Sequence, residues 1–329
     1  MQKILVARPI FPEVVERLKA HFEVDWNDGP ALAPDELVRR LADKDGALTA
    51  GDMIDATVLA AAPRLRVVAN MAVGYNNFDI AAFNAANVLA TNTPDVLNES
   101  TADFGWALMM AAARRITESE RWLRDGQWQG WRHDGFLGVD IHGSTLGIIG
   151  MGRIGQALAR RARGFGMHVI YHNRSRVAPD VEAELAAQYR PKADLLREAD
   201  HVVLVLPYTP ENRHTIGAAE LALMKRTATL TNIARGGIVD DAALAVALRE
   251  RRIAAAGLDV FEGEPGVHPG LLSVPNVVLT PHIASASETT RRAMADLAAD
   301  NLIAGLDVGP LAGQPPNPIN PQVLGKARS

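Results

Sequence analysis

The chain has 329 residues, of which 48% are hydrophobic and 22% charged, and its formal net charge is −4. The length predicts two domains, and the near-neutral balance gives no electrostatic case for binding nucleic acid or an anionic membrane. Because the chain has no cysteine, disulfides, thiolate catalysis and cysteine-ligated metals are excluded. The opening segment MQKILVARPI is typical of a strand rather than a signal peptide, and no apolar run approaches the length of a membrane span, so a cytoplasmic protein is expected.

Short apolar runs alternate with helical patterns in the first part of the chain. Strands are expected at KILVAR (3–8), EVDWN (23–27), GALTA (46–50), RVVAN (66–70) and VLATN (88–92). Helical patterns lie between them, beginning with PEVVERLKAHF, whose apolar residues recur at helical spacing. Alternation of this kind predicts a parallel sheet flanked by helices.

A second series of the same kind begins near residue 98, with a long helical pattern over 98–115. Its strands are expected at 145–150, 168–171, 201–206, 228–233, 257–260 and 276–280. Continuous runs such as HVVLVL fit strands that are buried on both faces. A last helix is expected at about 287–306, followed by an irregular Pro- and Asn-rich tail. The prediction is therefore two α/β domains, one formed by 1–97 plus 287–329 and the other by 98–286.

The segment GIIGMGRIG contains the pattern Gly150-x-Gly152-x-x-Gly155 directly after an expected strand and directly before an expected helix. In this context the first glycine permits a tight turn, the second lets the backbone approach a pyrophosphate, and the third lets the helix pack closely on the strand. The free N–H groups of the helix start then bind the phosphates. A plain glycine turn is the alternative. We expect a dinucleotide to bind at Gly150, Gly152, Arg153, Ile154 and Gly155.

The end of the next strand carries HNRS where a carboxylate would bind both ribose hydroxyls of NAD. An acidic residue there would repel a 2′-phosphate, whereas Arg174 can form charge-assisted bonds to it, with Asn173 and Ser175 as neutral donors. A solvated basic turn is the alternative. The sequence therefore predicts NADP as the cofactor, with NADPH preferred and NADH possible.

Three candidate catalytic residues lie just beyond expected strands: Arg235 in NIARGGIVD, Glu264 in LDVFEGEP and His282 in LTPHIAS. Each has a plain alternative: Arg235 could lie in a surface turn, Glu264 could be a solvated carboxylate, and His282 could be a structural histidine. Open α/β sheets bind ligands beyond the carboxyl ends of their strands, so the three are expected at one rim together with the dinucleotide loop.

At this point the chain resembles the D-isomer-specific 2-hydroxyacid dehydrogenases, and within them the glyoxylate/hydroxypyruvate reductases and 2-ketogluconate reductases. The resemblance rests on MAVGYNNFD, NESTADFGWAL, TLGIIGMGRIGQALA, LVLPYTPENRH, TNIARGGIVD, AAGLDVFEGEP and NVVLTPHIASAS, in order over most of residues 66–305. It implies an α/β protein in which a Rossmann doubly wound parallel sheet is inserted in a flavodoxin-like α/β substrate domain. It also implies a homodimer with residues 118–145 as the arm.

The resemblance further implies reduction of a small 2-oxo acid to the D-2-hydroxy acid by hydride transfer from the nicotinamide. His282 would donate the proton to the carbonyl oxygen, and Glu264 would favour the protonated imidazole and orient its ring. Arg235 would bind the substrate carboxylate and polarise the carbonyl. The backbone of Val73 and Gly74 would hold the other side of the carboxylate, although a simple glycine turn would also explain that loop.

Further cofactor contacts are implied at Thr101, Pro207, Ile233, Ala234 and Asp259. Asp259 resembles the family residue that contacts the nicotinamide amide, with a strand-end cap as the alternative. Trp131 resembles a tryptophan that some of these reductases insert into the neighbouring subunit's active site and that limits substrate size; packing at the dimer interface is the alternative. Ala284 departs from the usual glycine after the HI dipeptide and is expected to crowd the nicotinamide pocket slightly.

Two other functions remain open at this stage. The same architecture serves formate and phosphite dehydrogenases, but formate dehydrogenases carry Gln where Glu264 stands. Phosphite oxidation is disfavoured by the basic cofactor site and by the MAVGYNNFD loop. A non-catalytic NAD(P)-sensing scaffold would bind cofactor without turnover, and the sequence shows no extra interaction segment to support it.

Overall fold

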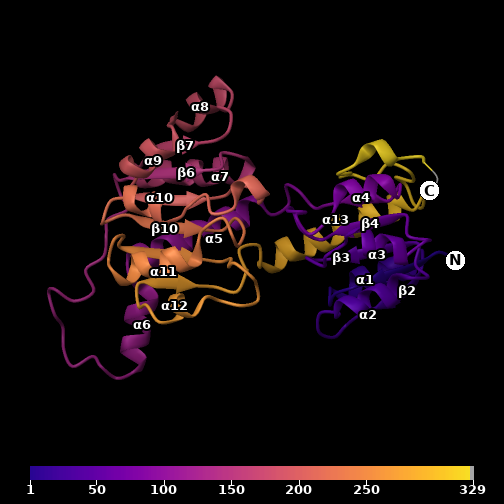
Figure 1. The fold of residues 1–329 in the computed structure, drawn as a ribbon, viewed down its shortest axis with the longest axis horizontal. Coiled ribbons are helices and arrows are strands. Elements are labelled where there is room, and N and C mark those ends of the chain that lie inside the picture. Colours follow the sequence, from indigo (N-terminus) through magenta and orange to yellow (C-terminus); the bar gives the residue numbers. More distant parts are fainter. Residues whose placement is uncertain (327–329) are drawn as a thin grey trace. The chain divides into compact units, whose positions relative to one another are not determined.

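The computed structural model describes residues 1–326, which form two compact units (Figure 1). Unit 1 consists of Met1–Leu97 together with the chain from Ala286 onward, and unit 2 consists of Asn98–Ser285. The first of the two domains predicted from the sequence extends to residue 329, and its last three positions lie outside the described residues. Both units are α/β, and every strand pair in them is parallel. Over residues 1–326, no helix is both long and apolar enough to cross a bilayer.

Unit 1 has a five-stranded sheet with the order β2-β1-β3-β4-β5, which is the flavodoxin-like order. Its strands are β1 (Lys3–Val6), β2 (Glu23–Trp26), β3 (Gly46–Thr49), β4 (Val67–Asn70) and β5 (Leu89–Thr91). Its helices are α1 (Pro12–Lys19), α2 (Pro34–Leu41), α3 (Ala56–Ala61), α4 (Ile80–Ala85), α13 (Glu288–Gly305) and the 3-10 turn η3 (Pro321–Val323).

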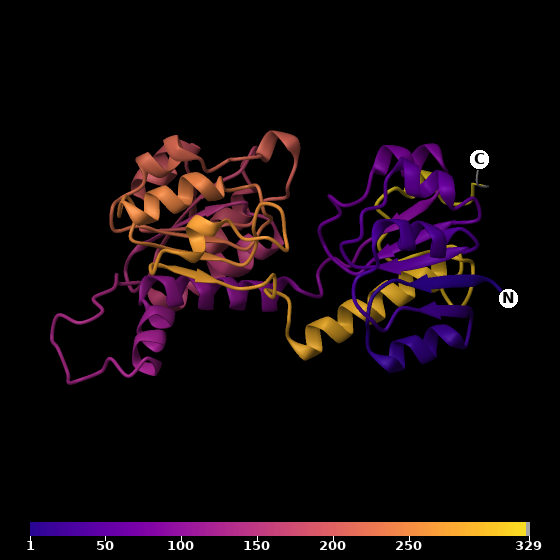
Figure 2. The ribbon, with the colours of Figure 1, turned by 60° about the horizontal axis from the view of Figure 1, so that its bottom comes forward.

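Successive side chains of a strand point to opposite faces, and the sheet of unit 1 is buried on both. In β1, Ile4 and Val6 pack with α1 and α13, whereas Leu5 packs with α2, α3 and α4. Helix α13, in orange to yellow in Figure 2, packs on β3, β4 and β5 of this sheet. The tail after α13 covers the edge of the sheet, because Thr91 pairs with Pro318 and the buried Asn320 bonds the backbone of Ala90 and Val88.

Unit 2 has a seven-stranded sheet with the order β12-β11-β10-β9-β6-β7-β8. Its strands are β6 (Thr145–Ile149), β7 (His168–His172), β8 (Ala187–Tyr189), β9 (His201–Leu204), β10 (Thr229–Asn232), β11 (Ala255–Leu258) and β12 (Val277–Leu279). The chain starts at β6, winds outward through β7 and β8, and then returns to the other side of β6 at β9. This is the Rossmann order, and the reversal beside β6 is the point at which such sheets bind dinucleotides.

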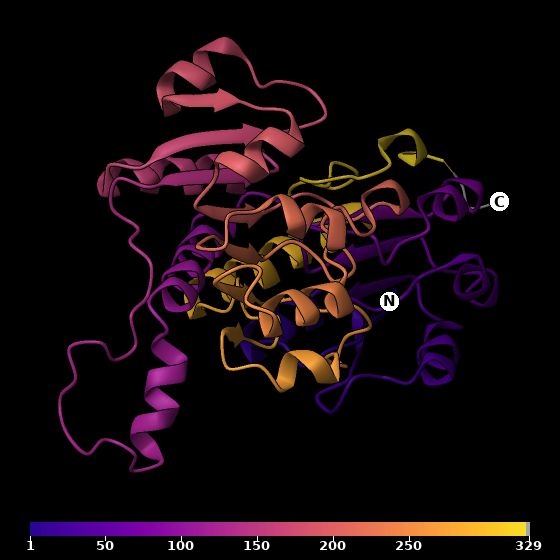
Figure 3. The ribbon, with the colours of Figure 1, turned by 60° about the vertical axis from the view of Figure 1, so that its left-hand side comes forward.

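The helices of unit 2 lie on both faces of this sheet. They are α5 (Asn98–Ala113), α6 (Ile116–Arg124), α7 (Arg153–Ala162), η1 (Arg163–Phe165), α8 (Pro179–Leu185), α9 (Lys192–Glu198), η2 (Pro210–Asn212), α10 (Ala218–Leu223), α11 (Asp241–Arg249) and α12 (Pro269–Leu272). Helix α6 differs from the other α-helices of unit 2 because none of its residues is buried. In Figures 1 and 3, α6 and the loop that follows it extend away from the body of unit 2.

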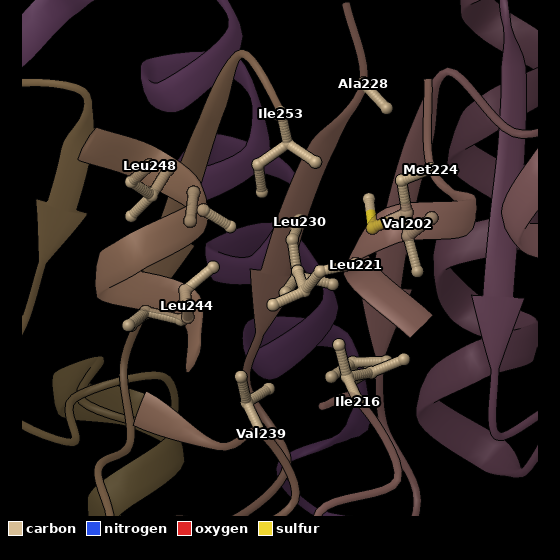
Figure 4. Close-up of a cluster of buried hydrophobic side chains, with 14 of the residues drawn as sticks. Val202, Ile216, Leu221, Met224, Ala228, Leu230, Val239, Leu244, Leu248 and Ile253 are labelled. Carbon is tan, nitrogen blue, oxygen red and sulfur yellow. The ribbon is translucent and has the colours of Figure 1, made fainter. Parts of the chain in front are cut away.

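Two apolar clusters make the sheet of unit 2 a rigid base for the loops at its carboxyl edge. Figure 4 shows the cluster under α10 and α11, where Leu221, Leu244 and Leu248 pack on Val202 and Leu230 of the strands. Each such fully buried side chain stabilises the fold by roughly 1.5–3 kcal/mol. The other face is filled by a second cluster, to which α5 and α7 contribute.

Candidate active site

The glycine loop joins β6 to α7, and each of its three glycines has a different environment. Gly150 has φ +108°, and a Cβ there would lie 2.7 Å from the backbone of Val205. A Cβ on Gly155 would lie 2.1 Å from the carbonyl oxygen of Gly150, so only glycine lets α7 pack this closely. At Gly152, by contrast, a Cβ would have no heavy atom within 4 Å. The backbone is therefore open at the one position where a pyrophosphate must approach it.

The start of α7 is suited to bind phosphate. Its N-cap is Gly152, no side chain among the described residues caps it, and its first turn contains no acidic residue. The first N–H groups of a helix have no partner within the helix and carry the positive end of the helix dipole. The loop and helix start therefore fit the pyrophosphate of a dinucleotide.

The segment after β7 contains two arginines with different surroundings. Arg176 forms a 2.7 Å ion pair with Glu182 and lies over the ring of Tyr189. Arg174 is exposed and has neither a hydrogen bond nor an ion pair with any residue of the described part. Asn173 accepts a 2.7 Å hydrogen bond from the Met151 N–H through Oδ1, which ties this segment to the glycine loop. Of the two guanidinium groups, that of Arg174 is the one not already paired.

Arg235 follows β10 in a loop that is fixed by its neighbours. The side chain of Asn232 accepts from the N–H of Ala234 and donates to the carbonyl of Arg235. A Cβ on Gly236 would lie 1.7 Å from the carbonyl oxygen of Phe261, so this loop packs directly on the loop after β11. Burial lowers the pKa of Arg235, and the charge of Glu264 opposes this shift. An arginine remains protonated in proteins, so the site holds a fixed positive charge.

Glu264 and His282 form a hydrogen-bonded pair at the ends of β11 and β12. The imidazole Nδ1 lies 2.8 Å from Glu264 Oε2, and Glu264 Oε1 accepts a 2.9 Å bond from the N–H of Phe261. Burial alone would raise the pKa of Glu264, but the bonds from His282 and Phe261, with the charges of His282 and Arg235, lower it. A carboxylate can only accept from Nδ1, which leaves Nε2 as the nitrogen that can deliver a proton outward.

The backbone of His282 has φ +54°, a left-handed conformation that is uncommon for a residue other than glycine. Asp259, which is fully buried, holds the chain in this shape. Its carboxylate accepts from the N–H groups of Ile283 and Ala284 and from the hydroxyl of Thr280, and its carbonyl accepts from the N–H of His282. Asp259 therefore positions His282, a structural role that the sequence offered only as the alternative to a nicotinamide contact.

The remaining candidate cofactor residues of unit 2 border the same edge. Pro207 follows β9, and Ile233 and Ala234 are buried directly after β10. Thr101 lies in the first turn of α5, where its buried hydroxyl has no hydrogen-bond partner in the described part of the chain. One turn further, a Cβ on Gly105 would lie 2.6 Å from the side chain of Ile233, so this end of α5 packs on the loop that carries Arg235.

Two candidate substrate residues lie in unit 1, in the loop after β4. The carbonyl of Val73 accepts from the side chain of Asn92, and that of Gly74 accepts from the side chain of Asn70. Within residues 1–326 the N–H groups of Val73 and Gly74 donate to no other residue. The loop is thus held through its carbonyl groups, while its amides can bind an anion.

Trp131 lies apart from the other candidates, in the loop after α6. The residue is 79% exposed, and its ring makes an edge contact with His133. No described contact joins it to Arg235, Glu264 or His282. Nor do three His, Asp or Glu side chains of the described residues come together as a metal site.

The chain is similar to known proteins over almost its whole length. The family model for the NAD binding domain of D-isomer specific 2-hydroxyacid dehydrogenases matches residues 106–284. The chain is 48% identical over 328 residues to glyoxylate reductase from Thermococcus onnurineus, with 98% of this chain and 97% of that one covered. It is 47% identical over 330 residues to glyoxylate reductase from Aeropyrum pernix, with the same coverage.

Solved structures agree with this similarity. The structure of the TT0316 protein from Thermus thermophilus has a TM-score of 0.89 at 41% identity and covers 97% of this chain and 100% of that one. An NADPH-dependent glyoxylate/hydroxypyruvate reductase from Sinorhizobium meliloti, in complex with NADP and malonate, has a TM-score of 0.85 at 36% identity and covers 100% of this chain and 98% of that one. The family model spans the glycine loop, Arg235, Glu264 and His282. The chain belongs to the D-isomer specific 2-hydroxyacid dehydrogenase family.

Proposed function

We propose that this 2-hydroxyacid dehydrogenase uses NADPH to reduce a small 2-oxo acid (glyoxylate, hydroxypyruvate or 2-ketogluconate) to the D-2-hydroxy acid. The observation that carries the proposal is the hydrogen-bonded His282–Glu264 pair at the end of the dinucleotide-type sheet, with the charge of Arg235 acting on the same Glu264. A proton donor and a fixed cation at one rim match what a 2-oxo acid requires during reduction. The curated relatives named glyoxylate reductase support the same substrate class.

Each residue has a distinct task in this proposal. When bound, the nicotinamide supplies the hydride to the carbonyl carbon. Arg235 binds the substrate carboxylate with its planar donors and polarises the carbonyl. His282 gives its Nε2 proton to the oxygen as negative charge develops there, and Glu264 stabilises the charged ring and keeps its orientation. The amides of Val73 and Gly74 are proposed to bind the carboxylate as well.

The contacts to the cofactor are proposed in the same way. The glycine loop with Arg153 and Ile154 would bind the pyrophosphate, and Thr101 would use its unpartnered hydroxyl near the phosphates or the nicotinamide. Pro207, Ile233, Ala234 and Asp259 would line the cofactor, Asp259 in addition to its contacts with the His282 segment.

An assay of cofactor oxidation tests the proposed function. NADPH and NADH consumption would be followed by the loss of absorbance of the reduced nicotinamide, with glyoxylate, hydroxypyruvate, pyruvate and 2-ketogluconate as separate substrates. We expect rapid oxidation of NADPH with at least one of glyoxylate, hydroxypyruvate and 2-ketogluconate. If cofactor binds but no acid is reduced, the protein is an NAD(P)-binding scaffold and not a reductase.

The preference for NADPH is proposed to rest on Arg174. A charge-assisted bond to the 2′-phosphate contributes about 1.5–3 kcal/mol, which corresponds to roughly 10- to 100-fold in affinity. We therefore expect Arg174→Gln to lower kcat/KM for NADPH by that factor and Arg174→Asp to lower it further, with kcat/KM for NADH nearly unchanged. Steady-state kinetics with both cofactors measure the change.

Arg176→Gln is the matched control, because it removes the neighbouring arginine, which is already paired with Glu182. It should leave the ratio of NADPH to NADH activity close to that of the wild type. If Arg176→Gln shifts the preference as strongly as Arg174→Gln, or if wild-type enzyme prefers NADH, the role of Arg174 is refuted.

The arm of α6 and the loop after it is proposed to bind a second copy of the chain. Its apolar side chains Ile116, Leu123, Trp128, Trp131 and Leu137 are all exposed. Exposed aromatic and aliphatic groups gathered on one projecting segment are typical of an association surface. Whether Trp131 also borders the partner's substrate site is part of this proposal. Sedimentation equilibrium tests it, and a monomer at micromolar concentration would refute it.

A further inference from the structure

A cluster of charged side chains connects the loops that bear the candidate catalytic residues. Arg213 and His214 belong to the loop after β9, and both bond the carboxylate of Glu262 in the loop after β11. Arg213 Nη2 lies 2.7 Å from Glu262 Oε1, and His214 Nε2 lies 3.0 Å from Oε2. The other nitrogen of His214 lies 3.7 Å from Asp240, which caps α11 at the end of the loop after β10. One carboxylate and one imidazole thus join three consecutive loops.

The backbone around Glu262 is held as firmly as its side chain. The N–H of Glu262 donates to the buried carboxylate of Asp241, and the N–H of Phe261 donates to Glu264 itself. Because a Cβ on Gly236 would overlap the carbonyl of Phe261, the turn 261–264 also lies directly on the loop of Arg235. The position of this turn therefore determines where the carboxylate of Glu264 meets His282.

His214 is placed for this contact by its own backbone. Its φ is +52°, which is uncommon for histidine, and its N–H donates a 2.7 Å bond to the carbonyl of Gly237. Two residues on, Ile216 pairs with Val239. The backbone around His214 is therefore held by the loop after β10, and this directs the imidazole to Glu262 in the loop after β11.

We infer that Glu262, held by Arg213 and His214, is a positioning residue that fixes the turn bearing Glu264 and through it the orientation of His282. The inference rests on the proposed function. Exposed ion pairs contribute little to folding, and Glu262 is 38% exposed, so the main effect is expected on geometry rather than on stability. A displacement of about 1 Å in a catalytic group can reduce the rate by up to about 100-fold.

The kinetic test compares Glu262→Gln, His214→Gln, the double variant and the control Glu250→Gln. Glu250 forms an equally short exposed ion pair, 2.7 Å to Arg252, at the far end of α11. We expect Glu262→Gln to lower kcat about 10-fold with KM for the 2-oxo acid and for NADPH within about twofold. His214→Gln should lower kcat less, and the double variant should resemble Glu262→Gln, because both changes remove one contact. The control should match the wild type.

A second measurement does not depend on turnover. The proton on His282 Nδ1 that bonds Glu264 should give a far-downfield NMR signal in the wild type and the control, identified by its loss in His282→Gln. We expect this signal to be broadened in Glu262→Gln and absent in Glu264→Gln. If the wild type reduces no 2-oxo acid, the proposed function fails, while this signal still decides the role of Glu262.

Two results would overturn the inference. One is an unchanged kcat together with an unchanged proton signal in Glu262→Gln. The other is a general loss, in which melting temperature, NADPH affinity and kcat all fall together in both Glu262→Gln and His214→Gln, since that pattern marks a structural residue. Rescue of kcat by Glu262→Asp, relative to Glu262→Gln, is expected in addition.

Discussion

Replacing His282 with alanine is expected to lower kcat for 2-oxo acid reduction by roughly 1,000-fold, within the range of about 10²–10⁴ that a general acid contributes. The hydride can still reach the carbonyl carbon in the variant, but the oxygen then has to take its proton from water. In the proposed reaction the ring of His282 contacts the substrate, so the affinity for NADPH should stay within about twofold of the wild type. Steady-state kinetics and cofactor fluorescence titration measure the two quantities.

His168→Ala is the matched control for this experiment, because His168 is an exposed histidine at the start of β7, the opposite end from the glycine loop. It should retain wild-type kcat. A His282→Ala enzyme with more than about a tenth of wild-type kcat would remove His282 from the role of proton donor.

The pKa of Glu264 sets how low the pH can fall before the His282–Glu264 pair loses the negative charge of its carboxylate. Since its pKa is lowered in the folded protein, the carboxylate stays charged below the ordinary glutamate value of about 4.3. Its contribution to stability is therefore fully present above the unfolded pKa and is lost as the pH falls through the lower folded value. At neutral pH the partner of His282 is a full negative charge.

Replacing Arg235 with glutamine is expected to lower kcat/KM for the 2-oxo acid by roughly 100- to 1,000-fold, the usual effect of removing one strong donor from a developing oxyanion. The loss should appear in both kcat and KM, because in the proposed reaction the same guanidinium polarises the carbonyl and binds the substrate carboxylate. Arg235→Lys keeps the charge but not the planar pair of donors, so it should recover only part of the activity. The measurement is the dependence of rate on 2-oxo acid concentration at saturating NADPH.

Arg252→Gln is the control for Arg235, since it removes an exposed arginine that pairs with Glu250 beyond the end of α11. It should leave KM unchanged. If Arg235→Lys matches the wild type, bidentate binding of the carboxylate is refuted, and if Arg235→Gln does so as well, Arg235 does not bind substrate.

The α/β class, the Rossmann sheet and the family could all be predicted from the sequence, because the signals are local. A strand with both faces buried reads as a short apolar run, as in β9, and the glycine loop reflects the backbone freedom that Gly150 and Gly155 require. The seven expected family segments lie within one continuous stretch that the family model also largely covers. Roles of individual residues stay predictions until the variants are measured.

Other features depend on contacts between residues far apart in the chain. Strand β8 has only three residues, and only Ala187 is buried. Because so few of its positions need an apolar side chain, the sequence contains no apolar run that would predict the strand. Helix α6 buries nothing and was expected only as part of an arm. Asn320 bonds Ala90, which lies 230 residues away, across the edge of β5. Nothing in the local sequence indicates such a contact.

The supports of the candidate site were missed for the same reason. Asp259 was expected to contact the nicotinamide amide, with a strand-end cap as the alternative, and its carboxylate bonds the segment after His282, 24 and 25 residues further along. Glu262 was not singled out in the sequence, yet it bonds Arg213 and His214 across 49 and 48 residues. The two closely spaced acids in EGEP could have indicated this contact. Two carboxylates in one turn repel each other unless each has its own positively charged or hydrogen-bonding partner.

The most direct test of 2-oxo acid reduction by this site follows the hydride itself. NADPH carrying deuterium at the transferable C4 position would be incubated with the enzyme and hydroxypyruvate, and the product separated on a chiral phase and weighed by mass spectrometry. We predict D-glycerate with one deuterium on C2, and almost none of it from His282→Ala in the same time. L-glycerate or unlabelled glycerate from the wild type would contradict the proposed reaction.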